Sequence, residues 1–173
     1  MVDINAKMKI PIVNEQDEII GYKEKKDLTI NDINRDTGLW VFDENGNILL
    51  SKRSSNKKIY PNCWSAAVAG TVEEGETYES NVIKEAEEEL GLLNIKPKFV
   101  CKYFKQKEIK RMNGMFKILI KHDYDFKVEP MEISEIRWFS RGELEELFLT
   151  TREMFTPNFP DYYKKFLEYE NQN

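Results

Sequence analysis

Cysteine is scarce in this chain of 173 residues, which contains only Cys63 and Cys101. Neither has a partner in a C-x-x-C motif, and the two do not make the closely spaced framework of a small disulfide-stapled secreted domain. We therefore expect two reduced thiols. The chain also has no apolar run that approaches a membrane span, and its start, MVDINAKMKIPIV, has no apolar stretch behind a basic segment. These absences predict a soluble cytoplasmic protein without a membrane partner.

Positive charge is in deficit, since 26 Lys and Arg residues stand against 31 Asp and Glu residues and the formal net charge is -5. A general attraction for nucleic acid polymers or anionic membranes is therefore excluded. A small phosphorylated substrate remains compatible with this charge, because a local basic patch or a divalent cation can reverse the field at a site. The length and the 40% hydrophobic content suit one globular domain.

Two hairpins are expected in the first part of the chain. Residues 7–13 and 19–25 form two β-rich runs around a turn, and Pro11 places the first run at a sheet edge. Residues 39–53 predict a second hairpin, because Asn45-Gly46-Asn47 supplies positive-φ residues between two apolar runs. A basic loop and then a buried strand over 63–70 should follow.

Helical periodicity begins at Thr77 and continues to Leu90. Val82, Ile83 and Ala86 share a narrow arc with Leu90, and Gly91 is a natural stop. Further strands are expected over 96–104, 114–126 and 135–139, followed by helices over 141–148 and 159–170. No repeat or long linker divides the chain.

Eight glutamates lie between Gly70 and Leu92. Glu85, Glu88 and Glu89 follow the spacing i, i+3 and i+4, which gathers them on one helix face. Carboxylates so close repel one another unless a hard cation neutralises them. Such a face is more often simply solvated, but Mg²⁺, with Mn²⁺ as an alternative, suits it because Mg²⁺ also accepts waters and substrate phosphate oxygens.

The spacing of the whole stretch resembles the signature of the Nudix hydrolase superfamily, G-x5-E-x7-R-E-U-x-E-E-x-G-U, in which U is bulky and apolar. Lys84 departs from this pattern where the family has arginine, and Ala86 is smaller than the usual apolar residue. Neither departure removes a proposed ligand. The matching positions are Gly70, Glu76, Glu85, Glu88, Glu89, Gly91 and Leu92.

The resemblance implies an α/β fold, a three-layer α/β/α sandwich with a mixed β-sheet. We expect one such domain over residues 1–173, with an N-terminal hairpin extension over 1–36 and the Nudix box over 70–92. A homodimer is a further expectation from the resemblance.

The resemblance also implies roles for the box residues. Glu76 should brace the loop by pairing with Lys84, and Glu85 or a carboxylate outside the box should act as base. Metal binding or water positioning falls to Glu85, Glu88 and Glu89, with the carbonyl of Gly70. A bound cation would lower the pKa of a water and neutralise charge on the diphosphate.

The segments before the box resemble the branch that includes type 1 isopentenyl diphosphate isomerase. In that isomerase a catalytic cysteine directly precedes the box glycine and a His-Pro pair follows it, whereas here Ala69 precedes Gly70 and Thr71-Val72 follows. Cys63 lies six residues upstream of Ala69 and cannot inherit the role. The isomerase also uses histidine metal ligands, but this chain has only His122.

Three functions therefore stay open. The first is a hydrolase that cleaves a diphosphate linkage in a nucleoside diphosphate joined to another moiety, or in a similar substrate. The second is an isomerase of the isoprenoid type, and the third is a Nudix-fold module that binds a ligand without turnover. We rank them in that order, because every box glutamate is present and the cysteine is absent.

Weaker signals lie outside the box. Glu132 and Glu135 have either a metal-linked role or a place in an exposed loop, the second being favoured. Packing is expected for Trp40, Trp64, Trp138 and the segment 155–159. Four cations before the box are candidates for substrate phosphate contacts, although such residues are often only solvated: Lys52, Arg53, Lys57 and Lys58.

Overall fold

The computed structural model describes residues 8–106 and 109–170. Within them, nine strands form one sheet. Its strands are β1 (Lys9–Val13), β2 (Ile19–Glu24), β3 (Ile33–Phe42), β4 (Ile48–Arg53), β5 (Trp64–Ala66), β6 (Val68–Thr71), β7 (Lys98–Gln106), β8 (Lys110–Leu119) and β9 (Ile133–Phe139). Strand β3 pairs with β1, β4, β6 and β8, and only its pairing with β8 is parallel. The mixed sheet expected from the sequence is confirmed.

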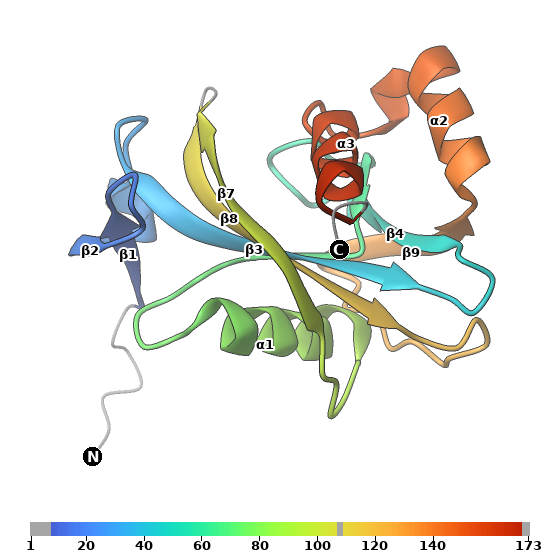
Figure 1. Cartoon of the computed structure of the whole chain (residues 1–173), viewed down its shortest axis with the longest axis horizontal. Coiled ribbons are helices and arrows are strands. Elements are labelled where there is room, and N and C mark those ends of the chain that lie inside the picture. The colour runs from blue at the N-terminus through green and yellow to red at the C-terminus, as the bar shows by residue number, and fades with distance from the viewer. Residues whose placement is uncertain (1–7, 107–108, 171–173) are drawn as a thin grey trace.

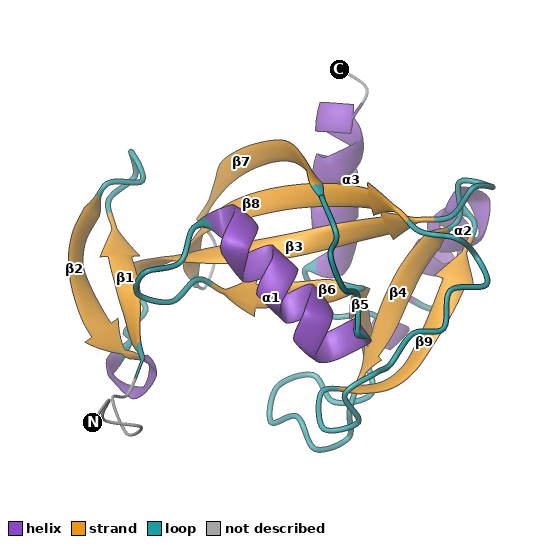
Figure 2. Ribbon diagram, turned by 90° about the horizontal axis from the view of Figure 1, so that it is seen from below, coloured by secondary structure: helices purple, strands orange, loops and turns teal. Residues whose placement is uncertain are grey.

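Helices cover both faces of this sheet (Figure 1). Helix α1 (Tyr78–Leu90) lies on one face, and α2 (Arg141–Thr150) and α3 (Phe159–Glu170) lie on the other. Figure 2, a view from below, shows α1 lying across the strands of the sheet. The predicted three-layer α/β/α class is therefore confirmed. Among the described helices, none has the length and apolar character needed to span a membrane.

The ends of α1 follow from local chemistry. The Thr77 side chain accepts a hydrogen bond from the Ser80 backbone N–H, and the Ser80 side chain accepts one from the Thr77 N–H, which completes a capping box. Gly91 ends the helix with a φ of 66°, a conformation that favours glycine. The predicted helix over 77–90 is confirmed, with Thr77 as its cap.

The core lies on both sides of β3, because successive strand side chains point to opposite faces. Leu39 and Val41 pack with the buried face of α1. Trp40 lies between them in sequence but packs against α3, where its ring stacks on that of Phe166 with 4.7 Å between centroids. Trp40 and Trp64 are buried and Trp138 is partly buried, so the packing predicted for the tryptophans is confirmed.

Pro11 does not mark a sheet edge, so this prediction was wrong. Strand β1 lies between β2 and β3, and β2 is the edge. The ladder between β1 and β3 contains only Ile12 and Val13. Pro11 lies just outside it, where its missing N–H interrupts no pairing with β3.

Two other strand predictions need correction. The single strand expected over 63–70 is two short strands, because the chain leaves its pairing with β4 at Ala66 and joins β3 at Val68. The strand expected over 114–126 ends at Leu119. His122 therefore lies in the following loop, where its Nδ1 is 2.7 Å from Asp43 Oδ2.

Asp17 ties the N-terminal hairpin to the rest of the domain. Its carboxylate pairs with Arg35 of β3 at 2.7 Å and with Lys102 of β7 at 2.5 Å, and it accepts a hydrogen bond from the Tyr78 hydroxyl at 3.0 Å. Its side chain is only 6% exposed. Burial alone would raise the pKa of Asp17, but these partners hold it below the ordinary value of 3.8.

We expect Asp17→Asn to lower the free energy of unfolding by about 2 kcal/mol at pH 7, because Arg35 and Lys102 lose a charged partner. Asparagine tolerates the positive φ of 67° found here, so backbone strain adds little. Because the pKa of Asp17 is lower in the folded than in the unfolded state, its ionised form stabilises the protein at pH values above the unfolded-state pKa. This stabilisation is lost as the pH falls below about 4. Urea unfolding from pH 7 to pH 3 measures the difference in unfolding free energy between the wild-type protein and Asp17→Asn. A difference that does not change with pH would contradict this account.

Candidate active site

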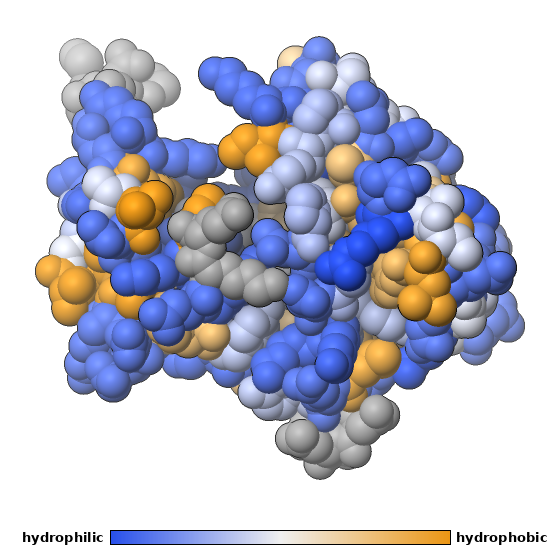
Figure 3. All heavy atoms as spheres, turned by 90° about the horizontal axis from the view of Figure 1, so that it is seen from above, coloured by the Kyte–Doolittle hydropathy of each residue, from blue (hydrophilic) through white to orange (hydrophobic). Residues whose placement is uncertain are grey.

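A cavity of about 700 Å³ opens beside the box. Its walls come from β3, β5, β6, β7, β8, the C-terminal half of α1, the start of α3, and the loops around Lys57 and Glu132. Figure 3 looks onto the α3 face, where a recess lies among mostly hydrophilic side chains. Gly70, Glu85, Glu88 and Glu89 all line the cavity.

Only glycine fits at position 70, because the Glu85 side chain occupies the space that a Cβ atom would take. A Cβ atom added to Gly70 would lie 2.4 Å from Glu85 Cγ and 2.7 Å from its Oε1. The bare glycine lets the α1 carboxylate approach the backbone of β6. The structure thus brings Gly70 and the first predicted carboxylate ligand together.

Crowding and burial disfavour the charged forms of two box glutamates. Burial, together with the charges of Glu85 and Glu132, raises the pKa of Glu89 from 4.5 to about 8 against the opposing effect of Lys57. Burial also raises the pKa of Glu85, and Glu88 adds to the rise while Lys84 opposes it. Such a site gains stability from an added cation.

Lys84 lies among three carboxylates of the box. Its Nζ is 2.6 Å from Glu76 Oε1, 3.1 Å from Glu73 Oε2 and 3.9 Å from Glu85 Oε1. Burial alone would raise the pKa of Glu76, but its contacts with Lys84, the Glu73 N–H and Asn81 hold that pKa below the ordinary value. Lys84 and Glu76 therefore lie in contact across the box, and Glu73 is a partner that the sequence reasoning missed.

Asn81 is a second missed residue. It is fully buried on α1, and its Nδ2 lies 2.8 Å from Glu76 Oε2 and 3.1 Å from the Thr71 carbonyl. Its Oδ1 accepts a short hydrogen bond from the Thr37 hydroxyl of β3. Asn81 thus joins the helix, the box loop and the sheet. The available signal was its place four residues before Glu85, on the face that carries the carboxylates.

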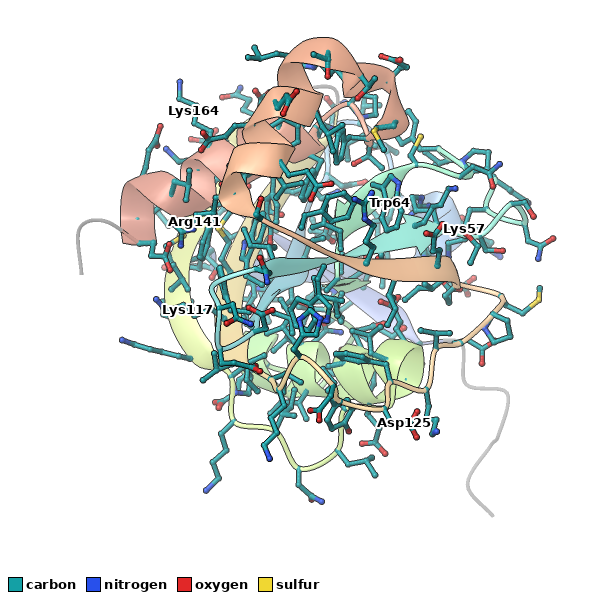
Figure 4. The ribbon with its side chains drawn as sticks, turned by 90° about the vertical axis from the view of Figure 1, so that its right-hand side faces the viewer. Lys57, Trp64, Lys117, Asp125, Arg141 and Lys164 are labelled. Atoms are coloured by element: carbon teal, nitrogen blue, oxygen red, sulfur yellow. The ribbon has the colours of Figure 1, made fainter. Side chains whose placement is uncertain are left out.

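Of the four basic phosphate candidates, only Lys57 lines the cavity. It lies on the loop after β4 (Figure 4) and pairs with Glu132. The Arg53 guanidinium, at the end of β4, instead donates to the carbonyls of Ile59 and Tyr60 in the loop that follows.

The other two candidates are also outside the cavity lining. Lys52 lies 3.6 Å from Glu135, a residue of β9 rather than of a loop, and Lys58 is exposed. Two cations that the sequence reasoning missed, Lys25 and Lys105, do line the cavity. They come from segments far from the box in sequence.

The donor set suits a hard divalent cation, since it consists of carboxylates and a carbonyl. Among the residues that the structure describes, no three acidic, histidine or cysteine side chains already form a metal-ligand cluster. Binding would therefore require rotamer changes or bridging waters, which Mg²⁺ commonly retains. A cation bound here would favour the charged forms of Glu85 and Glu89 and oppose the rise of their pKa values.

The NUDIX domain profile matches residues 33–159 of this chain. An uncharacterized Nudix hydrolase of Yersinia pestis is 29% identical over 151 residues, which are 86% of this chain and 80% of that protein. Another, of Pseudomonas aeruginosa, is 31% identical over 134 residues, 76% of this chain and 78% of that protein. The chain belongs to the Nudix hydrolase family, whose members are hydrolases of the pyrophosphohydrolase kind.

A solved structure and a more distant relative complete the comparison. A Deinococcus radiodurans crystal structure has the same fold, with a TM-score of 0.79, 22% identity, and coverage of 91% of this chain and 98% of that one. An isopentenyl-diphosphate Delta-isomerase of Salmonella heidelberg is 34% identical over 85 residues, 48% of this chain and 47% of that protein. The similarity to the isomerase branch is therefore confirmed.

Proposed function

We propose that this protein is a Mg²⁺-dependent hydrolase that cleaves the diphosphate linkage of a nucleoside diphosphate joined to another moiety, or of a similar small substrate. The observation that carries the proposal is the convergence of Gly70, Glu85, Glu88 and Glu89 on one cavity. A cavity of about 700 Å³ is of the size that holds a small ligand.

In the proposed reaction, a water oxygen attacks one phosphorus of the diphosphate. The bond from that phosphorus to the bridging oxygen breaks, and the bridging oxygen leaves with the electron pair on the other phosphate. The attacking water loses its proton to a carboxylate. Glu85 is one candidate base because burial already raises its pKa toward the working range of a general base, and a carboxylate outside the box is the alternative.

The cation would be held by Glu85, Glu88 and Glu89 with the Gly70 carbonyl. Its chemistry would be to lower the pKa of a water and to offset negative charge on the diphosphate. Lys57 supports the proposal from the opposite loop, since it is the one phosphate candidate among the four that lines the cavity. Lys84 and Glu76 would hold the box loop in shape.

The test is a screen of purified protein with Mg²⁺ against nucleoside triphosphates, ADP-sugars, dinucleoside polyphosphates and prenyl diphosphates. We expect hydrolysis of at least one nucleotide class, seen as phosphate and nucleotide products and abolished by EDTA. Turnover that persists after complete removal of divalent cations would contradict the proposed site.

The isomerase alternative makes a different expectation in the same screen. Ala69 supplies no thiol for allylic proton transfer, so isopentenyl and dimethylallyl diphosphates should not interconvert. Cys63 lies beside Trp64 at the start of β5 and does not line the cavity. Isomerised product that disappears in a Glu88 variant would favour the isomerase, whereas tight binding without any turnover would favour a ligand-binding module.

We also propose that the chain acts as one cytoplasmic Nudix domain, with residues 1–36 as its extension. Cys63 and Cys101 are free thiols, which supports a reducing compartment. The part of the predicted extension over 1–7 lies outside the described residues. Strands β1 and β2 support the predicted hairpin of that extension.

A further inference from the structure

The cavity continues beyond the box glutamates across the α3 face of the sheet. Four of the side chains that line the cavity form a row across neighbouring strands. In register order from β6 through β3 and β8 to β7, they are Thr71, Asp36, Asn113 and Tyr103. We call these four residues the distal row. Neighbouring strands are about 4.8 Å apart, so Asn113 lies about 10 Å from Thr71, the residue next to Gly70.

Asn113 carries a polar atom without a partner in the protein. Its Nδ2 is buried and makes no hydrogen bond. Buried donors are nearly always paired, because leaving one unpaired costs free energy. An unpaired amide in a cavity wall is explained if a ligand supplies the acceptor.

Asp36, the register neighbour of Asn113, already accepts hydrogen bonds from donors of the protein. Its Oδ1 accepts from Asn34 at 3.0 Å, from Thr71 at 3.1 Å and from Arg111 Nη1 at 3.2 Å, and Arg111 Nε lies 3.1 Å from its Oδ2. Four donors use most of the accepting capacity of a carboxylate, and Arg111 offsets its charge. The row therefore offers a ligand a donor, and the matching ligand atom is an acceptor.

Two cations line the same cavity as Asp36. Lys25 of the short helix Lys25–Asp27 and Lys105 of β7 both line it. The Tyr162 ring stacks on Trp40 with 5.1 Å between centroids, and its hydroxyl lies above Gly38, where a Cβ would be 2.0 Å away. Lys25 and Lys105 favour a ligand acceptor with negative charge over a neutral one.

We propose that the distal row, with Asn113 as its donor, binds an anionic oxygen group that the substrate carries away from its scissile diphosphate. The group is a phosphate or a carboxylate. The inference rests on the proposed function only in placing the diphosphate at the glutamate end. It narrows the substrate class to diphosphates with a second anionic group.

The test uses matched probes that differ in this group alone. NADP⁺ and NAD⁺ differ by one phosphate, and UDP-glucuronate and UDP-glucose differ by a carboxylate. Affinities are measured by titration calorimetry with Ca²⁺, an oxygen-preferring cation, in place of Mg²⁺. In one of the two pairs, we expect the probe with the extra anionic group to bind about ten- to hundredfold more tightly than the probe without it, and that pair identifies the group.

In Asn113→Ala and Asn113→Asp, that ratio of affinities should fall toward one. Two substitutions are used so that a folding defect in one, detected by its melting temperature, does not decide the result. Asn94→Asp is the matched control, because Asn94 is exposed and does not line the cavity, so the ratio should persist.

A ratio of one for both pairs in the wild-type protein would overturn the inference, as would an unchanged ratio in a folded Asn113 variant. Turnover with Mg²⁺ is measured separately. Absence of turnover with a preserved ratio would overturn the hydrolase proposal but not the distal row. Turnover of nucleotides with a ratio of one would do the reverse.

Discussion

Glu88→Gln and Glu89→Gln should each lower kcat about 100- to 1,000-fold with Mg²⁺, because each removes a charge that would face the cation rather than the core. The fold should persist. Ionised Glu89 is unfavourable in the protein without a cation, since its pKa is raised to about 8 by burial and by Glu85 and Glu132. Glutamine at this position should therefore leave the melting temperature without cation unchanged or higher.

The sign of this stability effect depends on pH. Between about 4.5 and 8 the folded protein holds a proton on Glu89 that the unfolded chain has released, so the unfolding free energy falls as pH rises through this range. In Glu89→Gln that fall should be smaller, and the raised pKa of Glu85 accounts for part of what remains. Thermal melts in EDTA from pH 5 to pH 8 measure it.

Glu87→Gln is the matched control for both variants. Glu87 lies on the same helix turn but is exposed and does not line the cavity. Its turnover should stay within about twofold of wild type, since a surface charge acts weakly. Equal losses in Glu87→Gln and Glu89→Gln, or no loss in either Glu88→Gln or Glu89→Gln, would overturn the site assignment.

Lys84→Glu should weaken Mg²⁺ binding and slow turnover about tenfold or more, because the new carboxylate would face Glu73, Glu76 and Glu85. The ion pair of Lys84 with Glu76 is partly exposed, so we expect the substitution to lower the free energy of unfolding by about 1 to 3 kcal/mol. Lys84→Arg should be mild, since it keeps the charge. Mg²⁺ titration and urea unfolding measure the two effects.

The double variant Glu76→Lys with Lys84→Glu tests the contact itself. It restores opposite charges and should recover part of the loss relative to Lys84→Glu alone. Recovery should be incomplete, because Glu76 also accepts hydrogen bonds from the Glu73 N–H at 2.9 Å and from Asn81 Nδ2 at 2.8 Å. Purely additive losses would mean that Lys84 and Glu76 do not act as a pair.

The sequence alone was sufficient where the signal is local. Helix α1 begins after Thr77 and ends at Gly91, because a cap and a left-handed residue act within a few positions. The hairpin around Gly46 formed as predicted for the same reason, and of its three turn residues only Gly46 has a positive φ. The spacing of the box glutamates also identified the family without coordinates.

Local patterns were misleading where a strand changes partner. Nothing in residues 63–70 marks the break at Ala67, since the run is apolar except for Ser65 and suits either strand. The break exists because β4 and β3 each accept one half of the run. Pro11 misled for a similar reason, because its effect depends on how far β1 extends along β3.

The chain by itself thus determined most of its elements, its core faces and the carboxylates on α1, since these follow from short-range periodicity and capping. Only the tertiary structure decided which other residues line the cavity of those carboxylates. Parallel pairing of β3 with β8 brings Asp36 beside Asn113, and the N-terminal hairpin brings Lys25 to the same cavity. These neighbours are far apart in sequence, and their register depends on how the whole sheet packs between its helices.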